Sequence, residues 1–291
     1  MITVRTAQEL GRERALWQAT DREVAFVPTM GALHQGHISL IRIARERAER
    51  VVASVFVNPT QFAANEDLSR YPRQPEKDAE MLAAAGCDVL FLPDVDTIYP
   101  PGHTAFVEPG GPAEGLEGAF RPGHFRGVAT VVLGLFNLVR PDVAVFGKKD
   151  AQQVAVVRQM VRDLHVPVEV VAAETVREPD GLAMSSRNVY LAPDERCAAA
   201  VLHRALVAAE QAIAGGERRG DAVRNILRRV LESEPLARIE YAEAVDGKTF
   251  QPLDVLCGQV VLPLAVRIGG TRLIDNFQLA VVEQESCRER C

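Results

Sequence analysis

Two histidines three residues apart form the segment of the sequence best suited to chemistry. His34 and His37 follow Val24–Val27, a short apolar run typical of a buried strand, and they open a segment of helical spacing. The first turn of a helix attracts phosphate through its backbone N–H groups and its dipole. Gly31 and Gly36 let the backbone come close to a ligand. Imidazoles at this spacing can donate hydrogen bonds to a phosphate whose charge grows in the transition state, so the segment predicts a phosphate site.

Metal binding is the alternative for a His-x-x-His pair. No third ligand is evident nearby, and no glutamate stands where a zinc-protease motif requires one. A single histidine is usually a hydrogen-bonded surface or core residue. Here two histidines and two glycines share one strand–turn–helix context, which favours phosphate binding.

The elements around this turn are those of a parallel sheet. Apolar runs alternate with segments of helical spacing through the first half of the chain, which predicts parallel strands with helices on both faces. The expected strands are 24–27, 51–57, 89–92, 143–146 and 168–171, and the expected helices are 37–50, 76–85, 127–140 and 151–164. The connections 62–75 and 94–126 are long enough to be lids or binding loops.

The pattern changes after about Thr175. An alanine-rich segment, Pro193–Ala214, predicts one long helix, and Asp221–Leu231 predicts a second helix capped by Asp221. Strand-like segments follow at 239–244, 259–264 and 271–277. We therefore predict an α/β protein with a Rossmann-like domain over residues 1–175 and a smaller α+β domain over residues 176–291 that covers the active site.

Composition narrows the function classes. The chain has 291 residues and a formal net charge of -6, which argues against a non-specific nucleic-acid binder. No apolar run approaches the ~20 residues of a membrane helix, and no membrane partner is expected. The five cysteines are odd in number and form no CxxC pair, so all are expected to be thiols, including Cys287 and Cys291 in the polar tail. These features predict a cytoplasmic protein.

Four sequence blocks carry a resemblance to a known family. The block His34-Gln35-Gly36-His37 resembles the nucleotidyltransferase superfamily, whose members form adenylates. Three further blocks, in the same order and at similar spacing, resemble the pantoate–β-alanine ligase (pantothenate synthetase) family. They are 56–62 (FVNPTQF), 146–153 (FGKKDAQQ) and 175–188 (TVREPDGLAMSSRN).

The resemblance implies an ATP-dependent ligase of coenzyme A precursor biosynthesis. Pantoate would attack the α-phosphate of ATP to give pantoyl adenylate and pyrophosphate, and the amine of β-alanine would then release AMP and form pantothenate. This chemistry needs no protein nucleophile, because AMP supplies the leaving group and the protein positions the reactants and stabilises charge. Mg²⁺ is expected with ATP, and the family implies a homodimer.

The resemblance also implies roles for individual residues. The catalytic residues would be His34, His37 and Lys149, with His37 as general acid. The ATP-binding residues would be Met30, Gly31, Ala32, Leu33, His34, Gln35, Gly36, His37, Gly147, Lys148, Lys149, Asp150, Val176, Met184, Ser185, Ser186 and Arg187. The pantoate ligands would be Asn58, Gln61 and Gln153. Arg121 and His124 are candidate supporting residues.

Two positions depart from the family pattern. The family usually has glutamate at the position of Lys148 and an aromatic residue at the position of Ala151. The extra charge of Lys148 would strengthen nucleotide attraction or lower the pKa of Lys149, and Ala151 would remove ring packing near the nucleotide. Two alternatives stay open: another nucleotidyltransferase, acting on a phosphorylated cofactor precursor, and a nucleotide-binding module without turnover.

Overall fold

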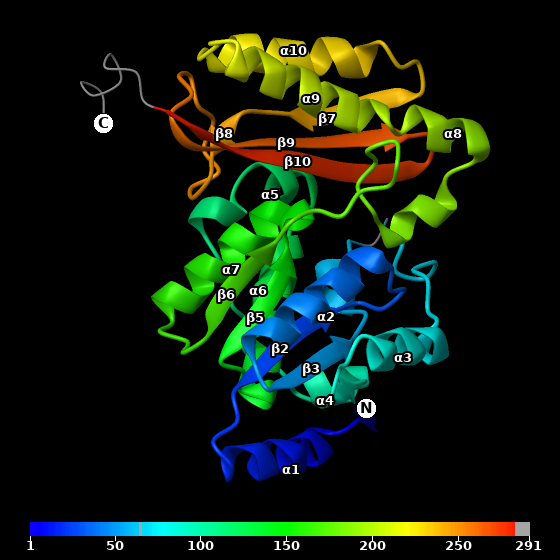
Figure 1. Ribbon diagram of the computed structural model, residues 1–291, viewed down its shortest axis with the longest axis vertical. Helices are drawn as coiled ribbons and strands as arrows, with labels where there is room; N and C mark the ends of the chain where they lie inside the picture. The colour runs from blue at the N-terminus through cyan, green and yellow to red at the C-terminus, as the bar shows by residue number, and fades with distance from the viewer. Residues whose placement is uncertain (64–65, 283–291) are drawn as a thin grey trace.

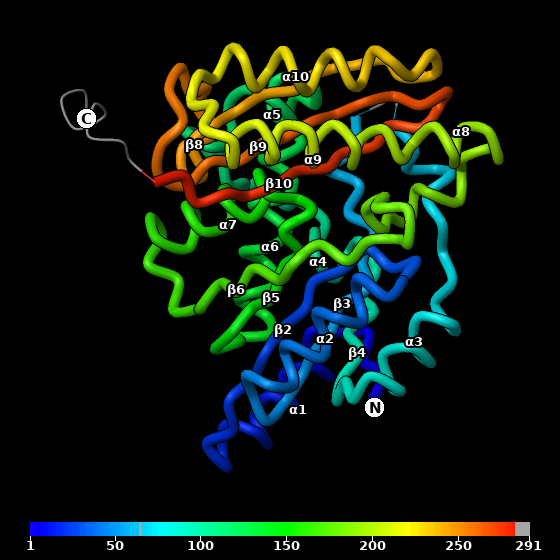
Figure 2. The backbone as a smooth tube through the Cα atoms, turned by 45° about the horizontal axis from the view of Figure 1, so that its top comes forward, coloured from blue at the N-terminus to red at the C-terminus, as the bar shows by residue number. Residues whose placement is uncertain are grey.

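The computed structural model describes residues 1–63 and 66–282 and contains two separate sheets (Figures 1 and 2). The first sheet has six strands in the order β1-β4-β3-β2-β5-β6, and every pair is parallel. Its strands are β1 (Ile2–Val4), β2 (Val24–Thr29), β3 (Arg50–Val55), β4 (Val89–Phe91), β5 (Val143–Gly147) and β6 (Glu169–Ala173). The predicted Rossmann-like sheet is confirmed.

Helices cover both faces of this sheet because its strands are apolar on both sides. On β2, Val24 and Phe26 face one core, and Ala25 and Val27 face the other. The first core is covered by α1 (Ala7–Gln18), α6 (His124–Val139) and α7 (Ala151–Asp163), and the second by α2 (Gln35–Arg47) and α3 (Pro75–Ala84). The connections hold α4 (Val95–Ile98), α5 (Leu116–Phe120) and the 3₁₀ turns η1 (Pro59–Gln61), η2 (Gly111–Ala113) and η3 (Lys148–Asp150).

The second sheet is antiparallel and forms the core of the C-terminal region. It consists of β7 (Ala237–Ala242), β8 (Val245–Asp246), β9 (Gly258–Ile268) and β10 (Thr271–Val281), in the order β10-β9-β7 with β8 also paired to β9. The 3₁₀ turn η4 (Ser186–Tyr190) leads into α8 (Pro193–Ala198), α9 (Val201–Ala214) and α10 (Gly220–Glu232). Figure 1 shows α9 and α10 on the outer side of this sheet and β10 on the side toward the parallel sheet.

Several predicted boundaries are wrong. The segment 193–214 contains two helices, because the chain turns at Ala199 and Ala200. Asp221 lies within the first turn of α10, and the N-cap position is Arg219. The start of α6 is His124 rather than Gly127, and α1 and β1 were not predicted.

The segment Pro193–Ala214 also meets the length and hydropathy criteria for a membrane span. Half of its most apolar window is buried in the protein. Its buried side chains, among them Leu202, Ala205 and Leu206, belong to the core that α9 and α10 form with the antiparallel sheet. The helix face that carries these side chains is packed in the protein core, so it cannot also contact lipid. This is the burial expected of a core helix.

The strand order fixes where a ligand cleft can form. Strands β2 and β5 are neighbours, and the chain winds outward from them in opposite directions, to β3 and to β6. In open parallel sheets, ligands bind beyond the carboxyl ends of the strands at such a point. The His34–His37 turn follows β2, and the Lys148–Asp150 turn follows β5.

Candidate active site

The two histidines of the first motif cap helix α2 with their own rings. His34 is the N-cap residue, and its Nδ1 accepts the Gly36 N–H at 3.1 Å. The Nδ1 of His37 in turn accepts the His34 N–H at 3.3 Å. Because each Nδ1 accepts a backbone hydrogen bond, each neutral ring carries its proton on Nε2. The ring centroids are 4.1 Å apart, so the two Nε2–H donors lie side by side.

Both rings are neutral in this structure. Burial, with help from the nearby Lys149, lowers the pKa of His34 to about 4. Burial, followed by the charges of His34 and Lys149, lowers the pKa of His37 to about 3. A neutral imidazole can donate one hydrogen bond to a phosphate oxygen without bringing a net charge into the site.

The loop before these histidines is held by a buried carboxylate that the sequence did not single out. Asp78 of α3 accepts the N–H groups of Ala32 and Leu33 at 2.9 and 2.8 Å. Gly31 adopts φ +82°, and a Cβ there would lie 3.0 Å from the Asp78 carboxylate. The prediction that this turn offers free backbone N–H groups is therefore wrong for Ala32, Leu33 and Gly36, whose N–H groups already have acceptors.

A cavity of about 220 Å³ brings most of the predicted residues together. Of the predicted residues, its lining contains Met30, His34, Gly36, His37, Asn58, Gln61, Gly147, Lys149, Asp150, Gln153, Val176, Met184, Ser185, Ser186 and Arg187. Gly31, Ala32, Leu33, Gln35 and Lys148 are absent from this lining. The apolar part of the wall, which the sequence analysis missed as site residues, includes Phe56 and the α6 residues Val128, Val131, Val132 and Leu135.

On the η1 side of the cavity, Asn58 orients Gln61. Asn58 is 1% exposed, and its amide N–H donates to Gln61 Oε1 and to the carbonyl oxygen of Gly127, both at 3.1 Å. Its Oδ1 accepts from the Thr60 hydroxyl at 2.9 Å and from the Tyr99 hydroxyl at 2.9 Å. Asn58 thus uses its polar atoms within the protein and supports Gln61, while it also lines the cavity.

The Gln61 main chain is held by two further groups that the sequence marked as supporting residues. His124 Nδ1 lies 2.9 Å from the Gln61 carbonyl oxygen, and Arg121 donates to the same oxygen at 3.4 Å. Arg121 also donates to His124 Nε2 at 3.1 Å, so the histidine proton lies on Nδ1. Gln153, on α7, lines the same cavity as Gln61.

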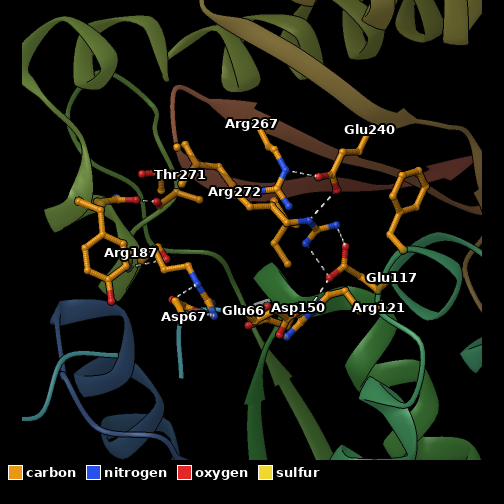
Figure 3. A pocket seen from close by; sticks show the side chains of 18 of the residues that line it. Glu66, Asp67, Glu117, Arg121, Asp150, Arg187, Glu240, Arg267, Thr271 and Arg272 are labelled. Atoms are coloured by element: carbon orange, nitrogen blue, oxygen red, sulfur yellow. Dashed lines mark hydrogen bonds and ion pairs between the residues drawn. The ribbon is translucent and has the colours of Figure 1, made fainter. Parts of the chain in front are cut away.

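A second cavity, of about 640 Å³, adjoins the first beneath β10 (Figure 3). The two share Arg121, Lys149, Asp150, Ser185 and Arg187. Arg187, a predicted phosphate ligand, makes a bidentate pair with Asp67 at 3.0 and 2.9 Å. A phosphate that binds this edge of Arg187 competes with the carboxylate.

Strand β10 of the C-terminal sheet holds two loops beside the cavity, one at Lys148 and Lys149 and one at Arg177. Asn276 of β10 donates to the carbonyl oxygens of Lys148 and Lys149, both at 2.9 Å. Asp275 accepts two hydrogen bonds from Arg177, at 2.6 and 2.9 Å, and its side chain is fully buried. These contacts span 98 residues or more of sequence, and no local pattern indicated them.

Neither departure from the family pattern lines the first cavity. The Lys148 ammonium forms an ion pair with Glu174. Ala151 is buried against Phe250 of the C-terminal region and lines a separate space of about 40 Å³. An aromatic side chain at this position would meet the C-terminal region as well as the turn that holds Lys149 and Asp150. Cys87 and Cys197 are thiols, whereas Cys287 and Cys291 lie outside the described residues.

The fold and this site define an α/β protein with a cavity where the carboxyl ends of β2 and β5 meet, which is where open parallel sheets bind their ligands. A profile of the pantoate–β-alanine ligase family matches residues 2–278. The pantothenate synthetase of Heliobacterium modesticaldum is 54% identical over 274 residues, which cover 93% of this chain and 98% of that protein. That of Herpetosiphon aurantiacus is 52% identical, over 95% of this chain and 99% of that protein.

Solved structures agree. A pantothenate synthetase from Thermus thermophilus superimposes with a TM-score of 0.91 at 48% identity, over 97% of this chain and 100% of that chain. A pantoate–β-alanine ligase from Francisella tularensis, complexed with an ATP species and β-alanine, gives a TM-score of 0.76 at 34% identity, over 95% and 97% of the two chains. This chain belongs to the pantoate–β-alanine ligase family. It is a ligase that condenses pantoate with β-alanine using ATP.

Proposed function

We propose that the 220 Å³ cavity forms pantoyl adenylate from pantoate and ATP, and that β-alanine then displaces AMP there. The observation that carries this proposal is the convergence of His34, His37 and Lys149 with the amides of Gln61 and Gln153 on one cavity. Forming the adenylate needs no protein nucleophile, because the pantoate carboxylate attacks the α-phosphate and pyrophosphate leaves. The residues therefore act by position and charge.

At the nucleotide end, three donors stabilise the phosphates. The Nε2–H groups of His34 and His37 donate to oxygens that gain charge as the leaving group departs. Lys149 adds a compact positive charge, and its pairing with Asp150, at 3.5 Å, is long enough to yield to a phosphate. Ser185, Ser186 and Arg187 belong to the same binding set, with Arg187 exchanging Asp67 for phosphate. The general-acid role of His37 stays a prediction, and it requires bound phosphate to raise the pKa of this ring.

At the acid end, Gln61 and Gln153 bind the hydroxyl and carboxylate groups of pantoate, for which an amide has both donors and an acceptor. The apolar wall formed by Phe56 and the α6 valines suits the two methyl groups of pantoate. Polar groups at one side and an apolar wall at the other orient the carboxylate toward the α-phosphate.

The finer expectations belong to this proposal. Residues 1–175 form the domain that binds the nucleotide and pantoate, and residues 176–291 cover the site and add phosphate ligands from the segment 184–187. The protein works as a cytoplasmic homodimer. No group of three or more His, Cys, Asp or Glu side chains within residues 1–63 and 66–282 is arranged to hold a metal ion. Mg²⁺ therefore enters as part of the ATP complex, as a substrate.

The test is product formation with each substrate omitted in turn. With ATP, Mg²⁺ and pantoate, we expect pyrophosphate exchange into ATP, and with β-alanine added we expect AMP and pantothenate. Binding of ATP with no AMP above background would favour the module without turnover. Exchange that depends on a phosphomonoester instead of pantoate would contradict the assignment of the acid end.

Variants test the individual roles. His37→Ala should nearly abolish exchange with a modest loss of ATP binding. Gln61→Ala and Gln153→Ala should mainly raise the KM for pantoate. Gln159→Ala is the matched control on α7, because Gln159 pairs with Asp163 and Arg162 on the helix surface. A loss of ATP use alone in Gln61→Ala would remove Gln61 from the acid pocket.

A further inference from the structure

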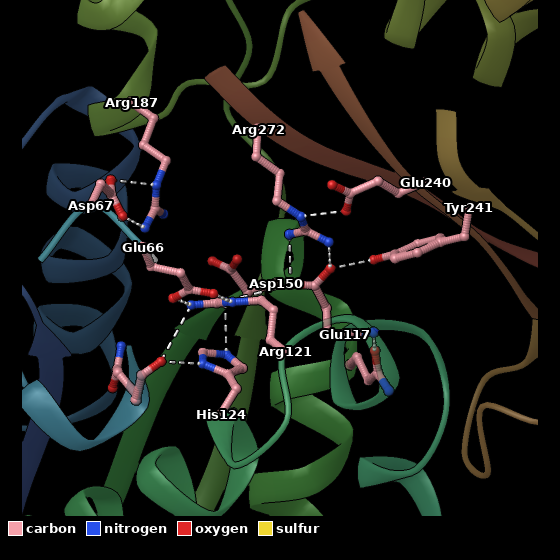
Figure 4. Close-up of polar contacts among 12 residues, drawn as sticks. Glu66, Asp67, Glu117, Arg121, His124, Asp150, Arg187, Glu240, Tyr241 and Arg272 are labelled. Carbon is pink, nitrogen blue, oxygen red and sulfur yellow. Dashed lines mark hydrogen bonds and ion pairs between the residues drawn. The ribbon is translucent and has the colours of Figure 1, made fainter. Parts of the chain in front are cut away.

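A buried line of charged groups joins strand β10 to the main chain of Gln61 (Figure 4). It begins at Arg272 of β10, whose guanidinium donates to both carboxylate oxygens of Glu117, at 2.9 and 2.5 Å. The Tyr241 hydroxyl of β7 donates to the same carboxylate at 2.7 Å. Glu117 lies on α5 of the parallel-sheet region, so two side chains of the C-terminal sheet hold one carboxylate across the junction.

Arg121 continues this line one helical turn further on. Its guanidinium lies 3.5 Å from Glu117 and makes a bidentate pair with Glu66, at 2.7 and 2.8 Å. The remaining donors of Arg121 reach His124 Nε2 and the carbonyl oxygen of Gln61. His124 holds the same carbonyl oxygen through Nδ1. The peptide group of Gln61 is therefore positioned by a guanidinium that is itself fixed from two sides.

The burial of this line makes its geometry stiff. The side chain of Glu117 is 7% exposed and that of Arg121 is 13% exposed. Burial by itself raises the pKa of Glu117, but the hydrogen bonds and charge of Arg272, with those of Arg121, outweigh it and lower the pKa to about 2. The carboxylate stays ionised at any working pH. A buried ion pair of this kind contributes little net stability, and its best-attested use is to fix one arrangement.

We propose that Arg121 is a positioning residue for the pantoate site, and that the Glu117–Arg272 pair makes the placement of Gln61 depend on the docking of the C-terminal sheet. This inference rests on the proposed function in one respect, namely that Gln61 binds pantoate. It adds that the acid end of the site is complete only when β10 is in place, although no residue of β7 to β10 lines the cavity that holds Gln61.

The direct test is Arg121→Lys in the full-length enzyme. Lysine keeps the charge but cannot hold Glu66, His124 and the Gln61 carbonyl at once. We expect the KM for pantoate to rise about tenfold, as for the loss of one charge-assisted hydrogen bond, with the KM for ATP changed less than about twofold. Arg45→Lys is the matched control, because Arg45 pairs with Asp88 outside this network and is 44% exposed.

Two further variants address the junction. Tyr241→Phe removes only the hydroxyl that donates to Glu117, and Arg272→Lys removes the bidentate pair. Each should raise the KM for pantoate about threefold or more and leave the KM for ATP unchanged, on the order expected for one lost hydrogen bond. Tyr241→Phe keeps the proposal testable if Arg121→Lys does not fold. Equal increases in both KM values would overturn the proposal, since they would indicate a merely structural role.

A double-mutant cycle separates this proposal from the proposed function. If Arg121 acts through Gln61, then Arg121→Lys should have little further effect on pantoate use in a Gln61→Ala background. Additive effects would show that Arg121 acts elsewhere and would overturn the inference while the assignment of Gln61 stands. Absence of any pantoate-dependent exchange in the unmodified enzyme would instead overturn the proposed function.

Discussion

Gly127 offers the sharpest test of how the protein places Gln61, the proposed pantoate ligand. This glycine lies in α6 where the helix touches η1, the turn that carries Gln61. A Cβ at Gly127 would lie 2.5 Å from the carbonyl oxygen of Thr60 and 2.7 Å from the backbone nitrogen of Gln61. Ordinary contact begins at 3.4 Å, so the Thr60–Gln61 peptide would have to retreat by 3.4 − 2.5 = 0.9 Å.

The magnitude follows from two opposed effects of Gly127→Ala. Alanine favours a helix by about 1 kcal/mol over glycine. The overlap with backbone atoms, which have no flexible side chain to move, costs about 1–3 kcal/mol. We expect a net loss of stability of about 1 kcal/mol from these terms. A displacement of the binding group by nearly 1 Å lowers kcat/KM for pantoate by roughly 100-fold.

The assay combines pantoate-dependent pyrophosphate exchange with chemical denaturation. Gly134→Ala is the matched control, because it makes the same change in the same helix and its Cβ meets no atom of the described residues within 4 Å. That variant should keep wild-type kinetics and gain up to about 1 kcal/mol. Gly127→Ala with unchanged kcat/KM for pantoate would refute the claim that α6 sets the position of Gln61.

Three further predictions concern the charged and titratable groups of the site. The folded-state pKa values of His34 and His37, about 4 and about 3, lie below their ordinary value of 6.5, so the unfolded chain binds more protons as the pH falls. The free energy of unfolding should therefore be constant above about pH 6.5 and fall toward pH 3, by up to about 1.4 kcal/mol per pH unit for each ring. In denaturation measured at a series of pH values, His37→Gln should make this fall shallower. Asp78→Asn should cost about 1.5–3 kcal/mol in urea unfolding and raise the KM for ATP, because an amide cannot accept from both loop N–H groups. Asp67→Asn should release Arg187 from its ion pair and lower the KM for ATP about threefold, the scale of a part-buried ion pair. A higher KM for ATP in this variant would contradict the exchange of Asp67 for phosphate.

The sequence predicted the parallel sheet because buried strands and amphipathic helices leave a local signal. At the N-terminus this local signal is weak, and α1 and β1 were not predicted. Helix α1 buries only Leu10, Arg14 and Trp17, and one of these is charged. Strand β1 has three residues, of which only Val4 is buried. Neither element repeats an apolar period long enough to be seen, and both are specified by tertiary contacts.

The residues of the site also divide into those with a local sequence signal and those without one. Local motifs marked His34, Lys149 and Gln61, whose roles depend on short, recognisable turns. Asp78 and Glu117 had no such signal, because a carboxylate on an amphipathic segment looks solvated until its distant partners are known. Glu117 meets Arg272 across 155 residues of sequence. A buried carboxylate of this kind can be found only when the fold brings its donors together.

The hydrogen-bond donors around the cavity differ in whether they already have a partner, and this difference predicts which of them a nucleotide would contact. Asp78 is 1% exposed and keeps the N–H groups of Ala32 and Leu33, so these donors are not released when a ligand enters. Arg187, by contrast, pairs with a carboxylate at the edge of an open cavity, and it can change partner. The phosphates should therefore depend on side chains, namely the imidazoles, Lys149 and Arg187, more than on helix-terminal amides. ATP binding through Lys149 and Arg187 should weaken as the salt concentration rises, because charges in a cavity open to solvent are screened more than buried hydrogen bonds are.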